Sequence, residues 1–130
     1  MARSDAARLP VYFLARDLDA RSGRICAVIA RARPDLADQL RRAAASVTLN
    51  IAEGAGEYRP LEKARFYRIA RRSASECTGI LDVILDHGLL TAGELRFERE
   101  LARRIVAQLV RLCKRMEAAH PTNPRPPRIP

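Results

Sequence analysis

Residues 41–57 (RRAAASVTLNIAEGAGE) constrain the fold of this chain more than any other stretch, because as a helix they are apolar on two sides. In an α-helix that turns by about 100° per residue, one apolar side is made of Leu40, Ala43, Ala44, Val47 and Ile51. A second apolar side carries Ala45, Leu49 and Ala52. A helix that is apolar on two sides is buried on two sides. We therefore expect the first side to face the core of a helical bundle and the second to form an oligomer interface.

A narrow polar strip lies between these two sides and carries Arg42, Ser46, Asn50 and Glu53. The next predicted helix carries Ser73 and Glu76, which antiparallel packing could bring close to the strip. One interpretation is a hydrogen-bonded network that sets the register of the two helices, because buried polar groups need partners. The alternative is that two buried carboxylates act as general acid and base. No nucleophile–base pair completes such a mechanism, so we expect a structural polar network and no catalytic residue.

The remainder of the chain predicts three more helices, which together indicate an all-α, antiparallel up-down four-helix bundle. The expected ranges are residues 11–32, 34–53, 60–87 and 92–118. Pro34 and Pro60 suit the first position of a helix, and Gly54 and Gly56 are expected to end the second helix in the left-handed conformation. Gly88 is expected to follow the end of the third helix, and Thr91 with Glu94 has the spacing of a capping box before the fourth.

Apolar residues at helical spacing give the expected core. The stripe of the third helix is Phe66, Ile69, Ala70, Ser73, Cys77, Ile80, Leu81 and Ile84. That of the fourth is Leu101, Ala102, Ile105, Leu109, Leu112, Cys113 and Met116. We expect one domain at 11–118, a flexible arm at 1–10 and a disordered, proline-rich tail at 119–130.

The three cysteines, Cys26, Cys77 and Cys113, have no CxxC spacing and lie among apolar residues, so we expect reduced core thiols in a cytoplasmic protein. The chain has no uninterrupted apolar run that would predict a signal peptide or a membrane span. A di-metal bundle needs a Glu-x-x-His pair on each of two helices, and His87 follows no glutamate at that spacing. We therefore expect no metal, no cofactor and no membrane partner.

The chain carries a net charge of +9, and 22 of its 24 basic residues are arginine. On the third and fourth helices the basic residues form rows away from the core stripes, and the candidate nucleic-acid-binding set is Arg65, Arg68, Arg72, Arg96, Arg103, Arg111 and Lys114. Arginine binds phosphate in a bidentate manner, and without interleaved aromatic residues such binding would be to the backbone. The alternative is that the rows are ordinary solvated faces of an arginine-rich composition.

Two segments, residues 41–57 and 66–76, also carry a family resemblance. The residues Arg41, Arg42, Ser46, Asn50, Ile51, Ala52, Glu53, Gly54, Gly56, Phe66, Ala70, Ser73 and Glu76 resemble the pattern of the 23S rRNA intervening-sequence, or S23-like, proteins. Arg72 departs from the pattern, which usually has glycine before the serine. The resemblance implies a four-helix bundle, a cyclic homo-oligomer (a pentamer) and a link to intervening sequences in ribosomal RNA genes. Related bundles are accessory proteins of retroelement reverse transcriptases, which implies an RNA or polymerase partner.

These observations lead to two hypotheses of different classes. The first is a non-enzymatic oligomeric bundle that binds RNA or DNA without sequence preference, as an accessory to an RNA- or retroelement-associated process. The alternative is a protein-interaction adaptor that binds no nucleic acid and pairs its basic face with an acidic partner. An enzyme that uses Glu53 and Glu76 is the third and least supported interpretation.

Overall fold

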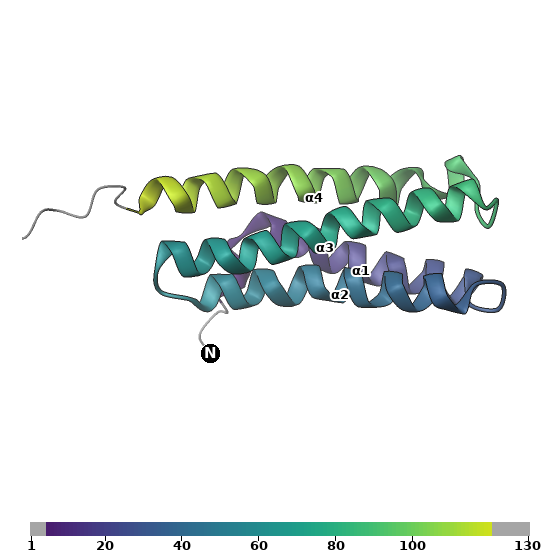
Figure 1. Cartoon of the computed structure of the whole chain (residues 1–130), viewed down its shortest axis with the longest axis horizontal. Helices are drawn as coiled ribbons and strands as arrows, with labels where there is room; N and C mark the ends of the chain where they lie inside the picture. Colours follow the sequence, from purple (N-terminus) through teal and green to yellow (C-terminus); the bar gives the residue numbers. More distant parts are fainter. Residues whose placement is uncertain (1–4, 121–130) are drawn as a thin grey trace, which may run out of the picture.

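The computed structural model describes residues 5–120, and every regular element in this part of the chain is a helix. A single 3-10 turn, η1 (Asp5–Arg8), precedes four α-helices: α1 (Pro10–Ile29), α2 (Pro34–Gly56), α3 (Pro60–Asp86) and α4 (Ala92–Ala119). The helices run alternately up and down with short connections (Figure 1). Each helix packs against its neighbours in the sequence, and α4 closes the bundle against α1. The four-helix bundle predicted from the sequence is confirmed.

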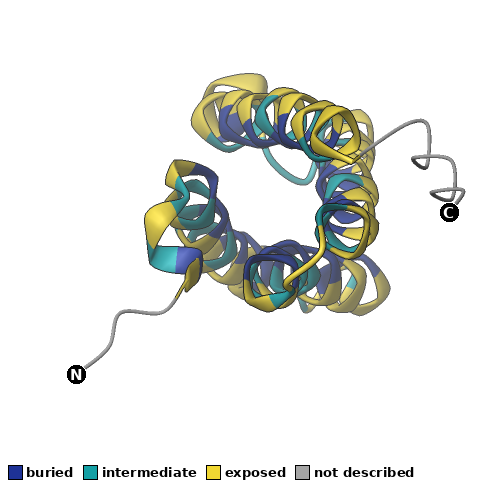
Figure 2. Ribbon diagram, turned by 90° about the vertical axis from the view of Figure 1, so that its left-hand side faces the viewer, coloured by how far each residue is buried: buried dark blue, intermediate teal, exposed yellow. Residues whose placement is uncertain are grey.

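The core is formed by the inward sides of all four helices (Figure 2). The five residues predicted for the inner side of α2, from Leu40 to Ile51, are each no more than 3% exposed. All three cysteines are free and buried, as predicted. Burial raises the pKa of the Cys77 thiol to about 12 and also raises the pKa values of Cys26 and Cys113. These thiols therefore stay protonated near neutral pH and pack as small apolar side chains.

The connection between α3 and α4 contains the glycine turn and the capping box that the local sequence predicts. Gly88 has φ of 68°, the left-handed conformation that glycine adopts without strain. The amides of Gly88 and Leu89 donate to the carbonyls of Leu85 and Ile84, which is the Schellman arrangement. Thr91 then caps α4: its side chain accepts from the Glu94 amide at 3.1 Å, and the Glu94 carboxylate accepts from the Thr91 amide at 3.0 Å. Both predicted signals are confirmed.

The end of α2 differs from the prediction. The helix continues through Gly54 to Gly56, and neither glycine has a positive φ. Gly54 is needed for close packing, because a Cβ atom there would lie 2.5 Å from Cε1 of Tyr67. The aromatic ring of Tyr67, which is 2% exposed, therefore lies directly against the backbone of α2.

The core stripe of α3 is also turned relative to the prediction. Phe66 is only half-buried and Ile69 is 36% exposed, whereas Tyr67 and Ala74 are buried in the core. The reason is that α3 packs against both α2 and α4, so its buried side is wide and is centred away from Phe66 and Ile69. The other stripe residues of α3 are buried as predicted.

The predicted boundaries need two further corrections. Helix α1 ends at Ile29 rather than near residue 32, and Gly23 does not interrupt it. Within the predicted N-terminal arm, residues 5–8 form η1, which packs on α2 and leaves Ala6 1% exposed. Residues 1–4 and 121–130, which include most of the predicted proline-rich tail, lie outside the described part of the chain.

Candidate nucleic-acid interface

The basic residues of α3 that were predicted to bind nucleic acid all lie on its outer side. Arg65, Arg68 and Arg72 are exposed. Arg65 lies 3.9 Å from the carboxylate of Glu62, and Arg68 lies 3.4 Å from that of Glu117 on α4. Arg72 makes no ion pair with any residue between 5 and 120. Exposed ion pairs of this kind are worth little, so all three guanidinium groups remain available to an anion.

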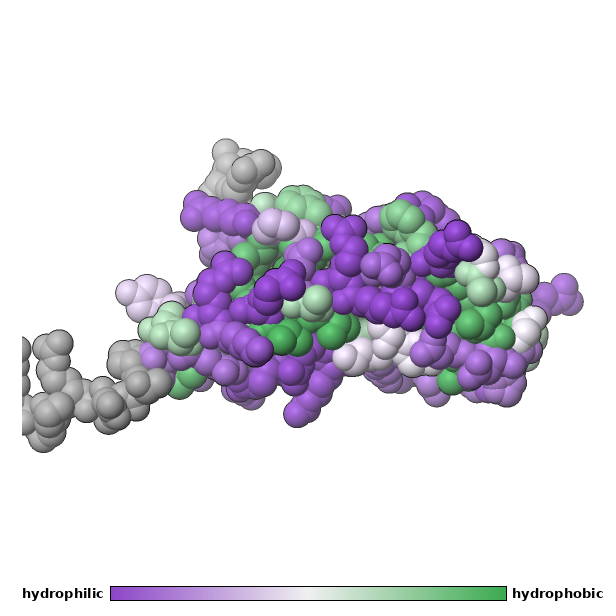
Figure 3. All heavy atoms as spheres, turned by 90° about the horizontal axis from the view of Figure 1, so that it is seen from above, coloured by the Kyte–Doolittle hydropathy of each residue, from purple (hydrophilic) through white to green (hydrophobic). Residues whose placement is uncertain are grey.

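The basic residues of α4 form the second half of the same surface. Arg96, Arg103, Arg111 and Lys114 are all exposed, and Arg103 lies 3.9 Å from the Glu100 carboxylate. The other three make no ion pair within the described part of the chain. Seen from above, where α4 faces the viewer, the molecule shows mostly hydrophilic side chains with small apolar patches between them (Figure 3). We call the seven residues from Arg65 to Lys114 the α3–α4 basic surface; they are Arg65, Arg68, Arg72, Arg96, Arg103, Arg111 and Lys114.

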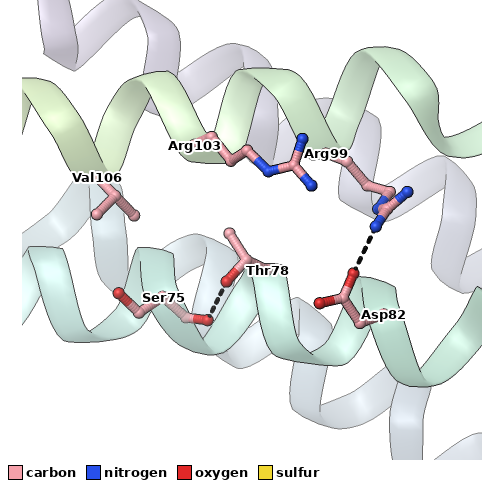
Figure 4. A pocket seen from close by; sticks show the side chains of 6 residues that line it. All are labelled: Ser75, Thr78, Asp82, Arg99, Arg103 and Val106. Atoms are coloured by element: carbon pink, nitrogen blue, oxygen red, sulfur yellow. Dashed lines mark hydrogen bonds and ion pairs between the residues drawn. The ribbon is translucent and has the colours of Figure 1, made fainter.

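A groove between α3 and α4 opens onto this surface (Figure 4). Its cavity is about 250 Å³ and is lined by Ser75, Thr78, Asp82, Arg99, Arg103 and Val106. Arg99 donates to Asp82 at 2.9 Å and so ties α4 to α3. The Arg99 Nε atom is buried and has no hydrogen-bond partner among the described residues. Sequence reasoning did not single out Arg99, because a pair between helices depends on their register and leaves no signal in local spacing.

The polar strip of α2 forms a smaller network than predicted. The hydroxyl groups of Ser46 and Ser73 share a hydrogen bond of 2.8 Å, which joins α2 to α3. Asn50 donates to the Ser46 carbonyl at 2.9 Å and to its hydroxyl at 3.1 Å. The Ser46–Ser73 bond joins the two helices as the predicted network requires, whereas Asn50 binds only Ser46 on its own helix.

The charged members of the predicted network lie elsewhere. Arg42 is exposed and pairs with Asp38 on its own helix at 3.0 Å. Glu53 and Glu76 are exposed, and neither makes a hydrogen bond or an ion pair with another described residue. The prediction that Glu53 and Glu76 belong to the buried polar network is wrong, because both side chains are exposed to solvent.

Two substitutions test whether the Ser46–Ser73 bond or the Glu53 carboxylate contributes to stability. Ser73→Ala should lower the free energy of unfolding by about 1 kcal/mol, because it leaves the Ser46 hydroxyl without its partner on α3. The matched change Glu53→Gln, on an exposed side chain, should alter it by less than about 0.5 kcal/mol. Urea denaturation followed by circular dichroism measures both. A larger loss for Glu53→Gln than for Ser73→Ala would show that the carboxylate belongs to the network.

The second apolar side of α2 faces solvent in the single chain. Leu49 is 63% exposed, and Ala45 and Ala52 are half-buried. A leucine exposed to this extent on the middle of a long helix has no packing partner within its own bundle. The position fits the predicted oligomer interface, and the interface itself stays a prediction.

Within residues 5–120, no three histidine, cysteine, aspartate or glutamate side chains are placed so that they could hold a metal ion. None of the described helices has the length and apolar character required to cross a membrane.

These features define a class: an arginine-rich, antiparallel four-helix bundle with exposed basic side chains along α3 and α4. The family model of the 23S rRNA-intervening sequence proteins matches residues 7–111, and the chain belongs to that family.

The fold is also similar to that of a solved structure. This is the crystal structure, at 1.70 Å, of a protein with unknown function from the S23 ribosomal protein family of Bacteroides thetaiotaomicron. The two share 16% sequence identity over 80% of this chain and 98% of that one, with a TM-score of 0.76. An identity this low supports the shared fold alone. No curated protein matches the chain.

Proposed function

We propose that this protein binds the backbone of RNA or DNA through the α3–α4 basic surface and has no enzymatic activity of its own. The observation that carries the proposal is the state of the seven cationic side chains. All are exposed, and Arg72, Arg96, Arg111 and Lys114 have no acidic partner within residues 5–120. An exposed arginine without an acidic partner can donate two hydrogen bonds to a phosphate without first breaking an ion pair, and an exposed lysine adds a positive charge.

The surface favours the backbone over the bases. Base recognition in single strands relies on aromatic side chains that stack on the bases. Phe97 lies beside Arg96, but the guanidinium group of Arg21 covers its ring at 3.9 Å. One face of this ring is therefore covered, and we expect affinity that depends mainly on charge and is indifferent to sequence.

The expected result of the direct test is binding that salt removes. Fluorescence anisotropy with labelled RNA and DNA oligonucleotides should show binding at low ionic strength. The plot of log affinity against log salt concentration should steepen by roughly 0.7–0.9 for each phosphate contacted. Oligonucleotides of unrelated sequence should give the same slope. If the protein binds neither RNA nor DNA at low ionic strength, the surface is an ordinary solvated face, and the adaptor hypothesis replaces this one.

The proposal includes self-association through Ala45, Leu49 and Ala52. An oligomer would repeat the basic surface in every subunit, so that weak contacts add up along one long polyanion. The exposure of Leu49 supports an interface, and the resemblance to the family implies a ring of five subunits. The buried free thiols fit a reducing compartment such as the cytoplasm. The name of the family suggests a role connected with intervening sequences in ribosomal RNA. The resemblance to accessory bundles of reverse transcriptases adds RNA or a polymerase as the proposed partner.

The substitution Leu49→Arg tests this assembly. It places a charge at the centre of the proposed interface and should convert the oligomer into monomers. The monomer should keep its helix content, because Leu49 contributes little to the core of its own bundle. Light scattering coupled to size exclusion gives the mass, and circular dichroism gives the helix content. Arg24→Ala, an exposed change on α1, is the control and should leave the mass unchanged. An intact oligomer in Leu49→Arg would show that the contact lies on another surface.

A further inference from the structure

A second groove lies between the start of α1 and the last turns of α4. Its cavity is about 240 Å³, several times the roughly 30 Å³ that one water occupies in the liquid. The residues that give it its chemical character are Arg8, Val11, Gln108, Arg111, Leu112 and Arg115. Arg8 comes from η1, and Arg111 and Arg115 come from successive turns of α4. Three guanidinium groups from two separate elements thus border one cavity.

The charge around this groove is unbalanced. None of the described residues that line it is acidic. All three arginines are exposed, and none makes an ion pair with another residue in the range 5–120. The α3–α4 groove is different, because Asp82 lies in it and pairs with Arg99 at 2.9 Å. The α1–α4 groove is therefore the better site for an anion.

The first turn of α1 adds a second, independent contribution. Pro10 and Val11 line the groove, so the amino-terminal end of α1 borders the cavity. The residue before the helix is Leu9, and no side chain caps the helix start. Pro10 has no N–H group and the Tyr12 amide donates to the Leu9 carbonyl at 3.0 Å, so the contribution of this end is its helix dipole. An uncapped helix start carries partial positive charge and favours an anion. Gln108 supplies a neutral amide that can donate to the same ligand.

We infer that the α1–α4 groove binds a terminal phosphate group, such as the 5′-phosphate at the end of a nucleic-acid strand. An internal phosphodiester carries one negative charge, whereas a phosphate monoester carries about −1.5 to −2 at neutral pH. Three arginines and a helix start match the larger charge and its three terminal oxygens. Inorganic phosphate and mononucleotides share this chemistry. The strand end is the ligand that the neighbouring basic surface favours, and in this form the inference rests on the proposed function.

The test compares one short RNA oligonucleotide with and without a 5′-phosphate. The phosphorylated form should bind the wild-type protein about tenfold more tightly at the same salt concentration, since charge-assisted hydrogen bonds of this kind are worth about that factor. Arg115→Gln should reduce this ratio to near one. Arg96→Gln removes the same charge from the other end of α4 and should weaken both oligonucleotides equally, leaving the ratio unchanged.

A second measurement distinguishes the sources of the phosphate. Inorganic phosphate at constant ionic strength should raise the melting temperature of the wild-type protein but not that of Arg115→Gln. If both oligonucleotides bind equally well and phosphate has no effect, the inference is wrong while the proposed function stands. If no oligonucleotide binds but phosphate still stabilises the wild-type protein through Arg115, the proposed function is wrong and the groove binds a free phosphate compound. If phosphate has no effect and no oligonucleotide binds, both are wrong.

Discussion

The double substitution Arg103→Glu and Arg111→Glu should lower the affinity for RNA and DNA by roughly 100-fold at low salt. Each change removes one phosphate contact and introduces a negative charge that repels the strand. The log–log salt slope should fall by roughly 1.4–1.8, which corresponds to two lost phosphate contacts. Both residues are exposed on α4, so the fold and the oligomer should be unaffected. Anisotropy titrations over a range of salt concentrations give the affinity and the slope together.

The control for this result has the same change in net charge at another place. Arg24 on α1 and Arg31 in the turn after it are exposed and lie on neither α3 nor α4. Replacing both with glutamate should reduce affinity only slightly through the overall charge and should leave the salt slope nearly unchanged. Equal losses in the two double variants would show that net charge, rather than the α3–α4 basic surface, governs binding.

The largest expected effect on stability is that of Gly54→Val. The new Cβ atom would lie 2.5 Å from one atom of the Tyr67 ring and 2.8 Å from another, and 3.2 Å from the carbonyl oxygen of Lys63. The ring is buried and cannot move away without repacking α2 against α3. We expect a loss of about 3 kcal/mol and a decrease of about 10 °C in the melting temperature. Calorimetry or thermal denaturation followed by circular dichroism measures it.

Two further variants show whether the clash is the cause. Gly23→Ala changes a glycine in the middle of α1 that has nothing within 4 Å of its added Cβ atom. This variant should be stabilised by about 0.5–1 kcal/mol, because alanine favours the helix. Tyr67→Leu removes the ring, and in its background Gly54→Val should cost much less than in the wild type. A full cost in both backgrounds would contradict the contact.

The sequence predicts the local elements of this fold because their signals are local. Gly88, Thr91 and Glu94 determine the connection between α3 and α4 through bonds that span only a few residues. Spacing also predicts the inner side of α2 correctly, because its core stripe has alanine, valine, leucine and isoleucine on one side.

Features that depend on neighbouring helices were predicted less well. The choice between Phe66 and Tyr67 for the core depends on how α3 is rotated, which two neighbours determine together. Gly54 was expected to end the helix, because glycine is common at helix ends. It lies instead inside α2, where the ring of Tyr67 packs too close to the backbone for any larger residue.

The same distinction applies to the candidate sites. Exposure of the seven basic residues follows from their spacing, and the structure agrees for each. The grooves could not be predicted, because each is bordered by residues distant in the sequence, such as Arg8 and Arg115. The Ser46–Ser73 bond agrees with the predicted polar network, because both serines lie where α2 and α3 pack against each other. Glu53 and Glu76 were assigned to the same strip by their spacing, but both are exposed, because spacing alone does not determine how far a side chain at the edge of a helix face is buried.

The order in which the helices pack has a consequence for how the protein folds. Three of the four helix–helix junctions join consecutive helices, whereas the fourth joins α1 to α4, at opposite ends of the chain. Contacts between consecutive helices close short loops and form rapidly, whereas a junction between distant segments costs more chain entropy. The α1–α4 junction should therefore form last and open first, with α2 and α3 assembled beforehand. A phosphate bound by Arg8 and Arg115 would bridge that same junction, so the ligand would slow unfolding by holding the two ends of the bundle together.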